Sequence, residues 1–403
     1  MDDSTANRGR RVHAAVGSLA LVVGACAASS SAAQPATRAG RLALPALPAD
    51  PVAEEKLLSE LGEGFRVRRS QHFSVACDAS QAALRGLLRR IEDTYVSVHL
   101  FCRAQEIPLR VSGAKLQIVF CNDWSTYAER ARRSQLDPAG TYGFYSQRRH
   151  RSVFCNIDRA PAVDRLRREI AQARDDLMAF EHVLRDFPPG TDRVELSFPD
   201  GRAATVTVPE AHRELANSRL RMRRLEVRLP RDVERLSRWA IQHETAHHVL
   251  FAGGVHVRGA TTPAWLLEGL ATQFEGPLAA EAGALPGIND ERLREFRRAH
   301  EQGRLIPVAR LLLDDELFTK NTANRVISYA QAWSLVYYLS RWESERFAAY
   351  VRALAARRPG ERVAAGNERS EFCRFLGPID ETFVRRWEKH ILALPVRMGE
   401  TRR

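Results

Sequence analysis

Hydrophobic and polar residues follow two different periods along this chain, and together they predict an α+β fold. Residues 72–77 (HFSVAC) and 115–121 (KLQIVFC) are short apolar runs typical of strands. Between them, residues 80–102 place apolar side chains three or four positions apart, the period of an amphipathic helix. Residues 143–145 and 152–156 are two further runs joined by a basic turn, which predicts a hairpin. We therefore expect a small mixed β-sheet in the N-terminal part, residues 64–159.

A strongly charged segment, residues 160–230, interrupts this pattern. Its first helical stretch ends at residues 188–190 (PPG), and two alternating runs flank residues 199–201 (PDG), as in a β-hairpin. A second charged helix follows over about residues 209–227, and Pro230 is a favourable first residue for the next helix. We expect an inserted helical hairpin, capped by a small β-hairpin, that acts as a scaffold or partner-contact arm without chemistry.

Residues 231–395 are predicted to be mainly helical. The first helix of this part ends at Gly253-Gly254, since glycine commonly follows a helix. Helical periodicity recurs at about residues 263–274, 290–301, 328–348 and 381–392. The sheet and these helices would form one catalytic domain that the insertion divides in two.

The N-terminus has the features of a targeting sequence. A basic stretch precedes residues 14–25, which are apolar but too few to span a bilayer, and small Ser and Ala residues follow. This pattern predicts a signal peptide over residues 1–33 and export to the cell envelope or the exterior. Residues 34–63 are rich in Ala and Pro and predict an extended tether.

The end of the predicted signal peptide allows two kinds of processing. Residues 23–26 (VGAC) resemble the lipobox of bacterial lipoproteins, which would make Cys26 a lipidated N-terminus and anchor the protein to a membrane. Ordinary signal-peptidase cleavage near residues 31–33, followed by free secretion, is the alternative.

The formal charge of +12 first suggests a nucleic-acid partner, because clustered basic residues bind phosphates. However, nearly all of the 61 basic residues are arginines spread through the sequence among Asp and Glu, so we expect a mixed-charge surface and no specific nucleic-acid binding. Five cysteines besides Cys26 permit one or two disulfides but set no connectivity. Since none forms a CxxC pair, buried thiols are favoured over a cysteine metal site.

Candidate chemistry is concentrated in residues 241–250 (IQHETAHHVL), which contain the pattern HExxH. His243 and His247 are four positions apart, so on a helix both imidazoles project from one face and can bind one metal ion. Glu244 lies beside the remaining coordination position, where a general base is needed. The alternative is that both histidines are satisfied core residues.

A catalytic zinc site usually has three protein ligands and one water. Glu268, in residues 262–271 (TPAWLLEGLA), is a suitable third ligand if its helix packs against the HExxH helix. We therefore expect one Zn²⁺ per chain, held by His243, His247 and Glu268. His248 points elsewhere on the helix and is expected at the surface or behind a ligand. Glu275 is expected as an exposed carboxylate, with contact to a ligand histidine as the alternative.

HETAH followed by WLLEGLA resembles the gluzincin peptidases, and more closely the peptidase MA-like family, also described as domain of unknown function 1570. The similarity extends to residues 64–157 and 234–392, through segments such as QIVFCNDWSTYAERA and YAQAWSLVYYL. The resemblance implies a zincin-like fold and metal-dependent hydrolysis of a peptide or protein substrate. It also places Tyr329 where related aminopeptidases carry a tyrosine that stabilises the transition state, although Tyr329 also fits an apolar packing stripe.

The sequence thus favours an exported zinc metallopeptidase in which Glu244 is the general base. By fold analogy, an extended peptide would add to the sheet at residues 152–156. An envelope-anchored binding or scaffold protein with the same fold and no catalysis is the competing hypothesis. The substrate, the cleavage specificity and the oligomeric state are left open.

Overall fold

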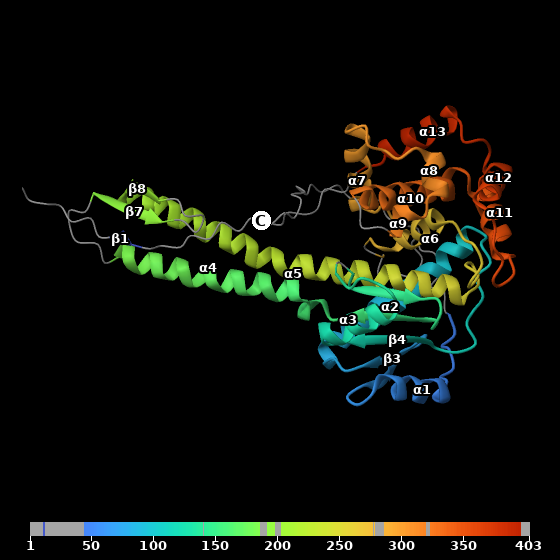
Figure 1. Ribbon diagram of the computed structural model, residues 1–403, viewed down its shortest axis with the longest axis horizontal. Helices are drawn as coiled ribbons and strands as arrows, with labels where there is room; N and C mark the ends of the chain where they lie inside the picture. The colour runs from blue at the N-terminus through green and yellow to red at the C-terminus, as the bar shows by residue number, and fades with distance from the viewer. Residues whose placement is uncertain are drawn as a thin grey trace, which may run out of the picture. The chain divides into compact units, whose positions relative to one another are not determined.

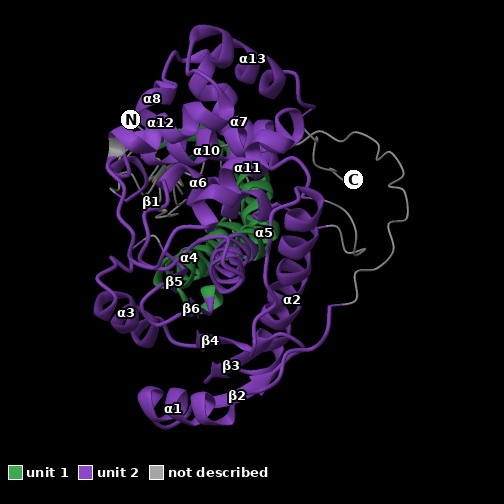
Figure 2. Cartoon of the chain, turned by 90° about the vertical axis from the view of Figure 1, so that its right-hand side faces the viewer, with its two compact units in different colours: residues 1–26, 157–236 green, residues 27–156, 237–403 purple. Residues whose placement is uncertain are grey.

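The computed structural model describes residues 11–12, 44–139, 141–185, 192–197, 203–276, 278, 286–319 and 323–395. They belong to two compact units (Figure 2). We call the unit that contains residues 157–236 the arm, and the unit that contains residues 44–156 and 237–395 the core unit. Apart from Arg11–Val12, the predicted signal peptide over residues 1–33, with Cys26, lies outside the described residues, and so does the tether before Leu44.

The core unit contains a five-stranded mixed sheet. The strand order is β2 (Arg66–Arg69), β3 (Phe73–Cys77), β4 (Leu116–Cys121), β6 (Arg151–Cys155) and β5 (Gly143–Ser146). Strands β3, β4 and β6 are parallel, whereas β2 and β5 pair antiparallel at the two edges. Helix α2 (Gln81–Ala104) connects β3 to β4, and α3 (Trp124–Arg133) lies between β4 and β5. The predicted α+β class is confirmed.

On this side of the sheet the edge strand is β5, so residues 152–156, where an extended peptide was expected to add, do not form the edge. Strand β6 pairs with β4 on one side and with β5 on the other. The reason lies in burial: four of the five residues of β6 are buried, whereas the last two residues of β5 are only partly so. The hairpin pattern predicts both strands but does not show which of them lies beside β4.

The chain is folded from about Leu47, earlier than the end of the predicted tether at residue 63. Leu47 is buried, and α1 (Pro51–Leu61) follows it. The Nε atom of Arg69 in β2 donates to the buried Glu54 of α1 at 3.0 Å, which attaches the helix to the sheet. Pro51 is the first residue of this helix, a position that proline favours, so here it does not indicate a linker.

The C-terminal part of the core unit is helical (Figure 1). Its elements are α6 (Ala264–Ala271), the 3₁₀ turn η2 (Thr272–Phe274), α7 (Asp290–Glu301), α8 (Val308–Leu313), α9 (Glu316–Thr319), α10 (Ala323–Trp342), α11 (Ser344–Ala355), α12 (Ala365–Leu376) and α13 (Glu381–Leu392). Helix α10 is buried along most of its length and packs against α6 and α7. None of the described helices combines the length and hydrophobicity that a membrane span requires.

Two helix boundaries differ from the prediction. The helix expected over residues 328–348 is two helices, because Glu343, with φ −132°, leaves the helical conformation and precedes α11. Pro230 does not begin a helix but lies inside α5 (Val208–Ala252). An internal proline removes one backbone hydrogen bond and costs about 3 kcal/mol. Helix α5 nevertheless continues on both sides of Pro230, so the remaining interactions of this 45-residue helix offset that cost.

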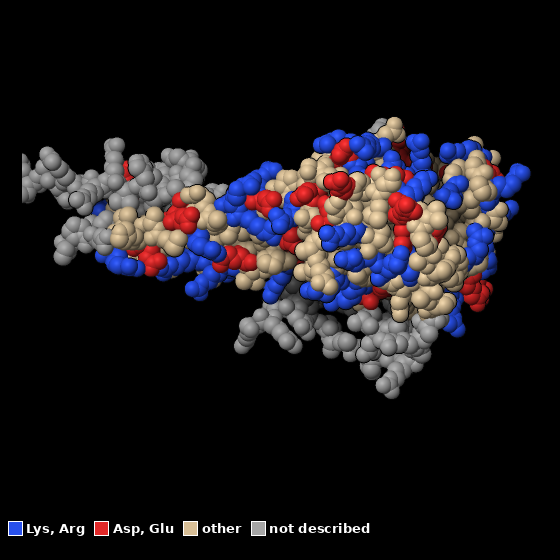
Figure 3. All heavy atoms as spheres, turned by 90° about the horizontal axis from the view of Figure 1, so that it is seen from below, with Lys and Arg blue, Asp and Glu red and all other residues tan. Residues whose placement is uncertain are grey.

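The arm consists of α4 (Pro161–Arg185), β7 (Arg193–Ser197), β8 (Ala203–Thr207) and the first part of α5. Strands β7 and β8 form an antiparallel hairpin, to which β1 (Arg11–Val12) adds in parallel. A small cluster of Phe180, Leu184, Val194, Ala211 and Leu215 packs α4, α5 and the hairpin together. Basic and acidic side chains are interspersed over the face of the molecule in Figure 3, as the mixed-charge expectation requires.

Candidate metal centre

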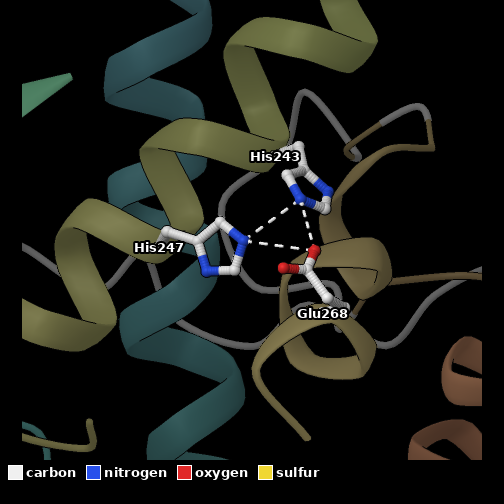
Figure 4. Close-up of side chains that lie close together, drawn as sticks. All are labelled: His243, His247 and Glu268. Carbon is white, nitrogen blue, oxygen red and sulfur yellow. Dashed lines mark hydrogen bonds and ion pairs between the residues drawn. The ribbon is translucent and has the colours of Figure 1, made fainter. Parts of the chain in front are cut away.

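The C-terminal part of α5 carries both histidines of the HExxH pattern on one side of the helix. The Nε2 atoms of His243 and His247 lie 3.1 Å apart, and each residue is only 8% exposed. Glu268 of α6 faces them, with its Oε2 atom 3.0 Å from His243 Nε2 and 3.5 Å from His247 Nε2 (Figure 4). One ligand atom from each of the three residues lies within 4.8 Å of the others. The predicted ligand set therefore converges.

Close packing positions the third ligand. Gly269 follows Glu268, and a Cβ atom at this position would lie 2.7 Å from the backbone oxygen of Ala332 in α10. Only glycine allows α6 to approach α10 so closely. The backbone that carries Glu268 is thus held against the most buried helix of the core unit.

The donor set fits a divalent cation. His243 Nδ1 lies 3.0 Å from Glu275 Oε1, so this nitrogen carries the proton and Nε2 is left as the ligand atom. Burial alone would lower the pKa of His243, but hydrogen bonds to Glu268 and Glu275 raise it to about 10. The negative potential that retains a proton at Nε2 would equally attract a metal ion, which would replace that proton.

Glu275 is part of the centre, contrary to the expectation of an exposed carboxylate. It is 3% exposed and accepts from Nε and Nη2 of Arg292 at 2.9 and 3.0 Å, and from Asn289 Nδ2 at 3.1 Å. Burial would raise the pKa of Glu275, but Arg292 and His243 hold it below the ordinary value. In the sequence, Glu275 follows Glu268 by seven residues, which is close to two helical turns. This spacing could have indicated that Glu275 lies on the same side as Glu268.

The general base predicted from the sequence, Glu244, lies at the edge strand. Its Oε2 atom accepts a hydrogen bond from the backbone N–H of Tyr145 in β5 at 2.8 Å. A Cβ atom at Gly143 would lie 2.7 Å from the Phe154 ring and 3.4 Å from Glu244 Cγ, so glycine permits the close approach of strand and helix. Burial raises the pKa of Glu244 above its ordinary value. A carboxylate with a raised pKa is a stronger proton acceptor.

Tyr329 of α10 lies close to the centre. Its ring centroid is 6.1 Å from that of His243, and Arg292 lies over the same ring at 5.3 Å. Burial and the charge of Glu268 raise the pKa of Tyr329 well above its ordinary value, so its hydroxyl keeps its proton. Tyr329 also packs against the apolar core. Its position therefore agrees both with a role in stabilising the transition state and with a packing role.

His248 is neither at the surface nor behind a metal ligand. It is fully buried, its Nδ1 atom lies 3.2 Å from Ser152 Oγ, and its ring contacts that of Tyr145. It therefore connects α5 to the sheet.

The five described cysteines contribute no ligand to this centre. Four of them are buried free thiols, three on the strands β3, β4 and β6 and one on α2, and the fifth is partly exposed: Cys77, Cys121, Cys155, Cys102 and Cys373. Burial raises the pKa of the Cys121 and Cys102 thiols to about 12. Among the described residues, His243, His247 and Glu268 are the group of metal-binding type that lies close enough to share an ion.

Comparison with known proteins gives a family match over part of the chain and no activity. Residues 239–361 match the model of a family described as a protein of unknown function (DUF1570). This range includes the three ligands, Glu244, Glu275 and Tyr329, and it excludes the sheet and the arm. No curated protein matches the chain.

Proposed function

We propose that this protein is a zinc-dependent peptide-bond hydrolase with a zincin-like catalytic fold. One observation carries the proposal: the ligand atoms of His243, His247 and Glu268 converge, and the Glu244 carboxylate is close enough to interact electrostatically with all three residues. We further propose export to the cell envelope or the exterior, either anchored through lipidated Cys26 or freely secreted.

Two histidines and one carboxylate leave a fourth position open for water, which is the arrangement of catalytic rather than structural zinc sites. Bound zinc supplies Lewis acidity, which polarises a carbonyl group and lowers the pKa of a coordinated water toward 7. His243, His247 and Glu268 would hold the ion. Glu275 orients His243 through Nδ1, and Arg292 keeps Glu275 ionised.

Glu244 is the proposed general base. Because Oε2 accepts the N–H of Tyr145, Oε1 is the oxygen that accepts a proton from the attacking water and delivers it to the nitrogen of the leaving amine. The same hydrogen bond holds the carboxylate in one orientation. Tyr329 would donate a hydrogen bond from its hydroxyl to the oxyanion that develops on the scissile carbonyl.

The free edge of β5 is the proposed binding site for the substrate backbone. Cys155 donates to the carbonyl of Tyr142, so in this antiparallel pair Gly143 and Tyr145 direct their backbone groups away from β6. The Tyr145 N–H is used by Glu244, and we propose that the other outward groups pair with an extended peptide. This edge replaces residues 152–156 as the proposed docking strand.

Zinc content and a Glu244→Gln variant test the proposal together. Purified protein should contain one zinc per chain, and a chelator should abolish cleavage of a peptide library. Glu244→Gln should retain the zinc and lower kcat/KM by about 100- to 10,000-fold, because it removes the base and no ligand. Glu345→Gln, at an exposed position of α11, is the control and should retain full activity. Near-wild-type hydrolysis by Glu244→Gln would disprove the assignment.

A scaffold or binding protein without catalysis is the second candidate, and the separate arm favours it. The arm is a compact unit of its own and contains none of the candidate ligands. Protein that lacks stoichiometric zinc after purification would support this function over hydrolysis.

A further inference from the structure

The core unit has a basic cavity at the C-terminal end of α5. Its volume is about 590 Å³, and it is bounded by the turn between β5 and β6, the end of α5 and the loop that follows. None of the described residues that line it is an aspartate or a glutamate. Its basic lining residues are Arg110, Arg148, Arg258, His150 and His256.

The three arginines of this cavity have no carboxylate partner among the described residues. Elsewhere in the core unit, arginines such as Arg69, Arg292 and Arg357 form ion pairs with glutamates. The end of helix α5 carries partial negative charge, but this amounts to only about half of one elementary charge. The cavity therefore retains a net positive charge.

His256 adds an unsatisfied polar group to the wall of the cavity. It is 1% exposed, and neither of its ring nitrogens has a hydrogen-bond partner among the residues that the structure describes. Burial lowers the pKa of His256 to about 3, so the ring is neutral at pH 7 and has one N–H to donate. Buried polar groups are nearly always hydrogen-bonded, so the imidazole N–H of His256 is a donor that is still open to a ligand.

Tyr145 connects this cavity to the candidate metal centre. Its backbone N–H donates to Glu244, its hydroxyl lies 2.6 Å from His150 Nδ1, and its ring stacks on Phe251 at 5.2 Å. His150 and Phe251 both line the cavity. An extended chain advances about 3.3 Å per residue, so a peptide along β5 would pass from Glu244 to the turn within two or three residues.

We propose that this cavity is a specificity subsite that binds an anionic side chain of the substrate, two or three residues from the scissile bond. The proposal rests on the peptidase function proposed above. The anion is a carboxylate or a phosphate ester, since guanidinium groups and an imidazole N–H bind both.

Peptide binding to full-length Glu244→Gln protein tests the subsite without turnover. Fluorescent peptides that differ only by Glu in place of Gln, two or three residues from the centre of the sequence, are compared by anisotropy. The Glu peptide should bind about tenfold more tightly, and Arg148→Gln and Arg258→Gln should each remove most of this difference. Both arginines are exposed, so neither substitution should disturb folding.

Arg149→Gln is the matched control. Arg149 lies in the same turn but lines a different cavity and is within 4.0 Å of Glu60, so its removal should leave the preference unchanged. A phosphoserine peptide that binds more tightly than the Glu peptide identifies a phosphate ester as the anion, and the reverse order identifies a carboxylate. Equal binding of the Glu and Gln peptides, or equal losses in the Arg149→Gln and Arg258→Gln variants, would overturn the subsite. Because no cleavage is measured, failure of the hydrolase proposal would be a separate result.

Discussion

Ion pairs of Glu and Arg that include or contact helix α5 lie in two different surroundings. In the arm, Glu226 of α5 pairs with Arg174 of α4, and their side chains are 32% and 58% exposed. In the core unit, His243 of α5 contacts Glu275, which pairs with Arg292, and the side chains of these last two are 3% and 8% exposed.

The difference in exposure changes what an ion pair does. Water and salt screen the exposed pairs of the arm, so each contributes little to stability. Loss of one partner from a buried pair leaves an uncompensated charge and costs about 3–5 kcal/mol. Charged residues of the arm can therefore be substituted at little cost in stability. Substitution of Glu275 or Arg292, in contrast, would disturb the geometry of the candidate metal centre.

Apart from the Glu244 variant, Tyr329→Phe provides the largest expected effect in the core unit. If the hydroxyl stabilises the oxyanion, kcat should fall by about 100- to 1,000-fold with little change in KM, because the interaction exists only in the transition state. Steady-state kinetics on one defined peptide measures both constants. An unchanged kcat would mean that Tyr329 only packs against His243 and the core.

Glu275→Gln should weaken zinc binding by about 10- to 100-fold, because His243 loses the carboxylate that orients its ring. Competition with a chelator of known affinity measures this change. Glu295→Gln is the matched control, since Glu295 also pairs with Arg292 at 3.0 Å but is not among the hydrogen-bond partners of His243. Equal losses in the two variants would show that Arg292, and not the contact with His243, determines the affinity.

Glu226→Gln should have the smallest effect. The loss of one exposed ion pair should shift the unfolding temperature by about 1 °C or less and leave zinc content and activity unchanged. Thermal unfolding at low and at physiological salt measures the shift. A shift of several degrees would show that exposed pairs in the arm do contribute to its stability.

The sequence predicts the centre of this molecule better than its surroundings. His243 and His247 are close in sequence, and helix geometry alone brings them together. The helix Asp290–Glu301 was predicted with its correct ends, since Asn289 caps it, acidic residues occupy its first turn and basic residues its last. The prediction that Glu268 is the third ligand required only that two helices that are neighbours in the sequence pack against each other.

Contacts between distant segments were not predictable. The burial of Glu275 depends on Arg292 of α7, and the hydrogen bond of Glu244 depends on which strand of a hairpin lies at the edge. The basic cavity combines a loop before β4, a turn and the end of α5, and no local pattern relates these segments. At Pro230 the local pattern was misleading: it predicted the start of a helix, but the structure has one continuous helix through this residue.

The buried thiols have a practical consequence. Cys121 and Cys155 stand opposite each other on neighbouring parallel strands, and burial raises the pKa of both. Only the thiolate reacts with alkylating reagents, so these two residues are protected while the sheet is intact and become reactive when it opens. Their rate of alkylation therefore reports the fraction of molecules with an open sheet, without an engineered cysteine or label.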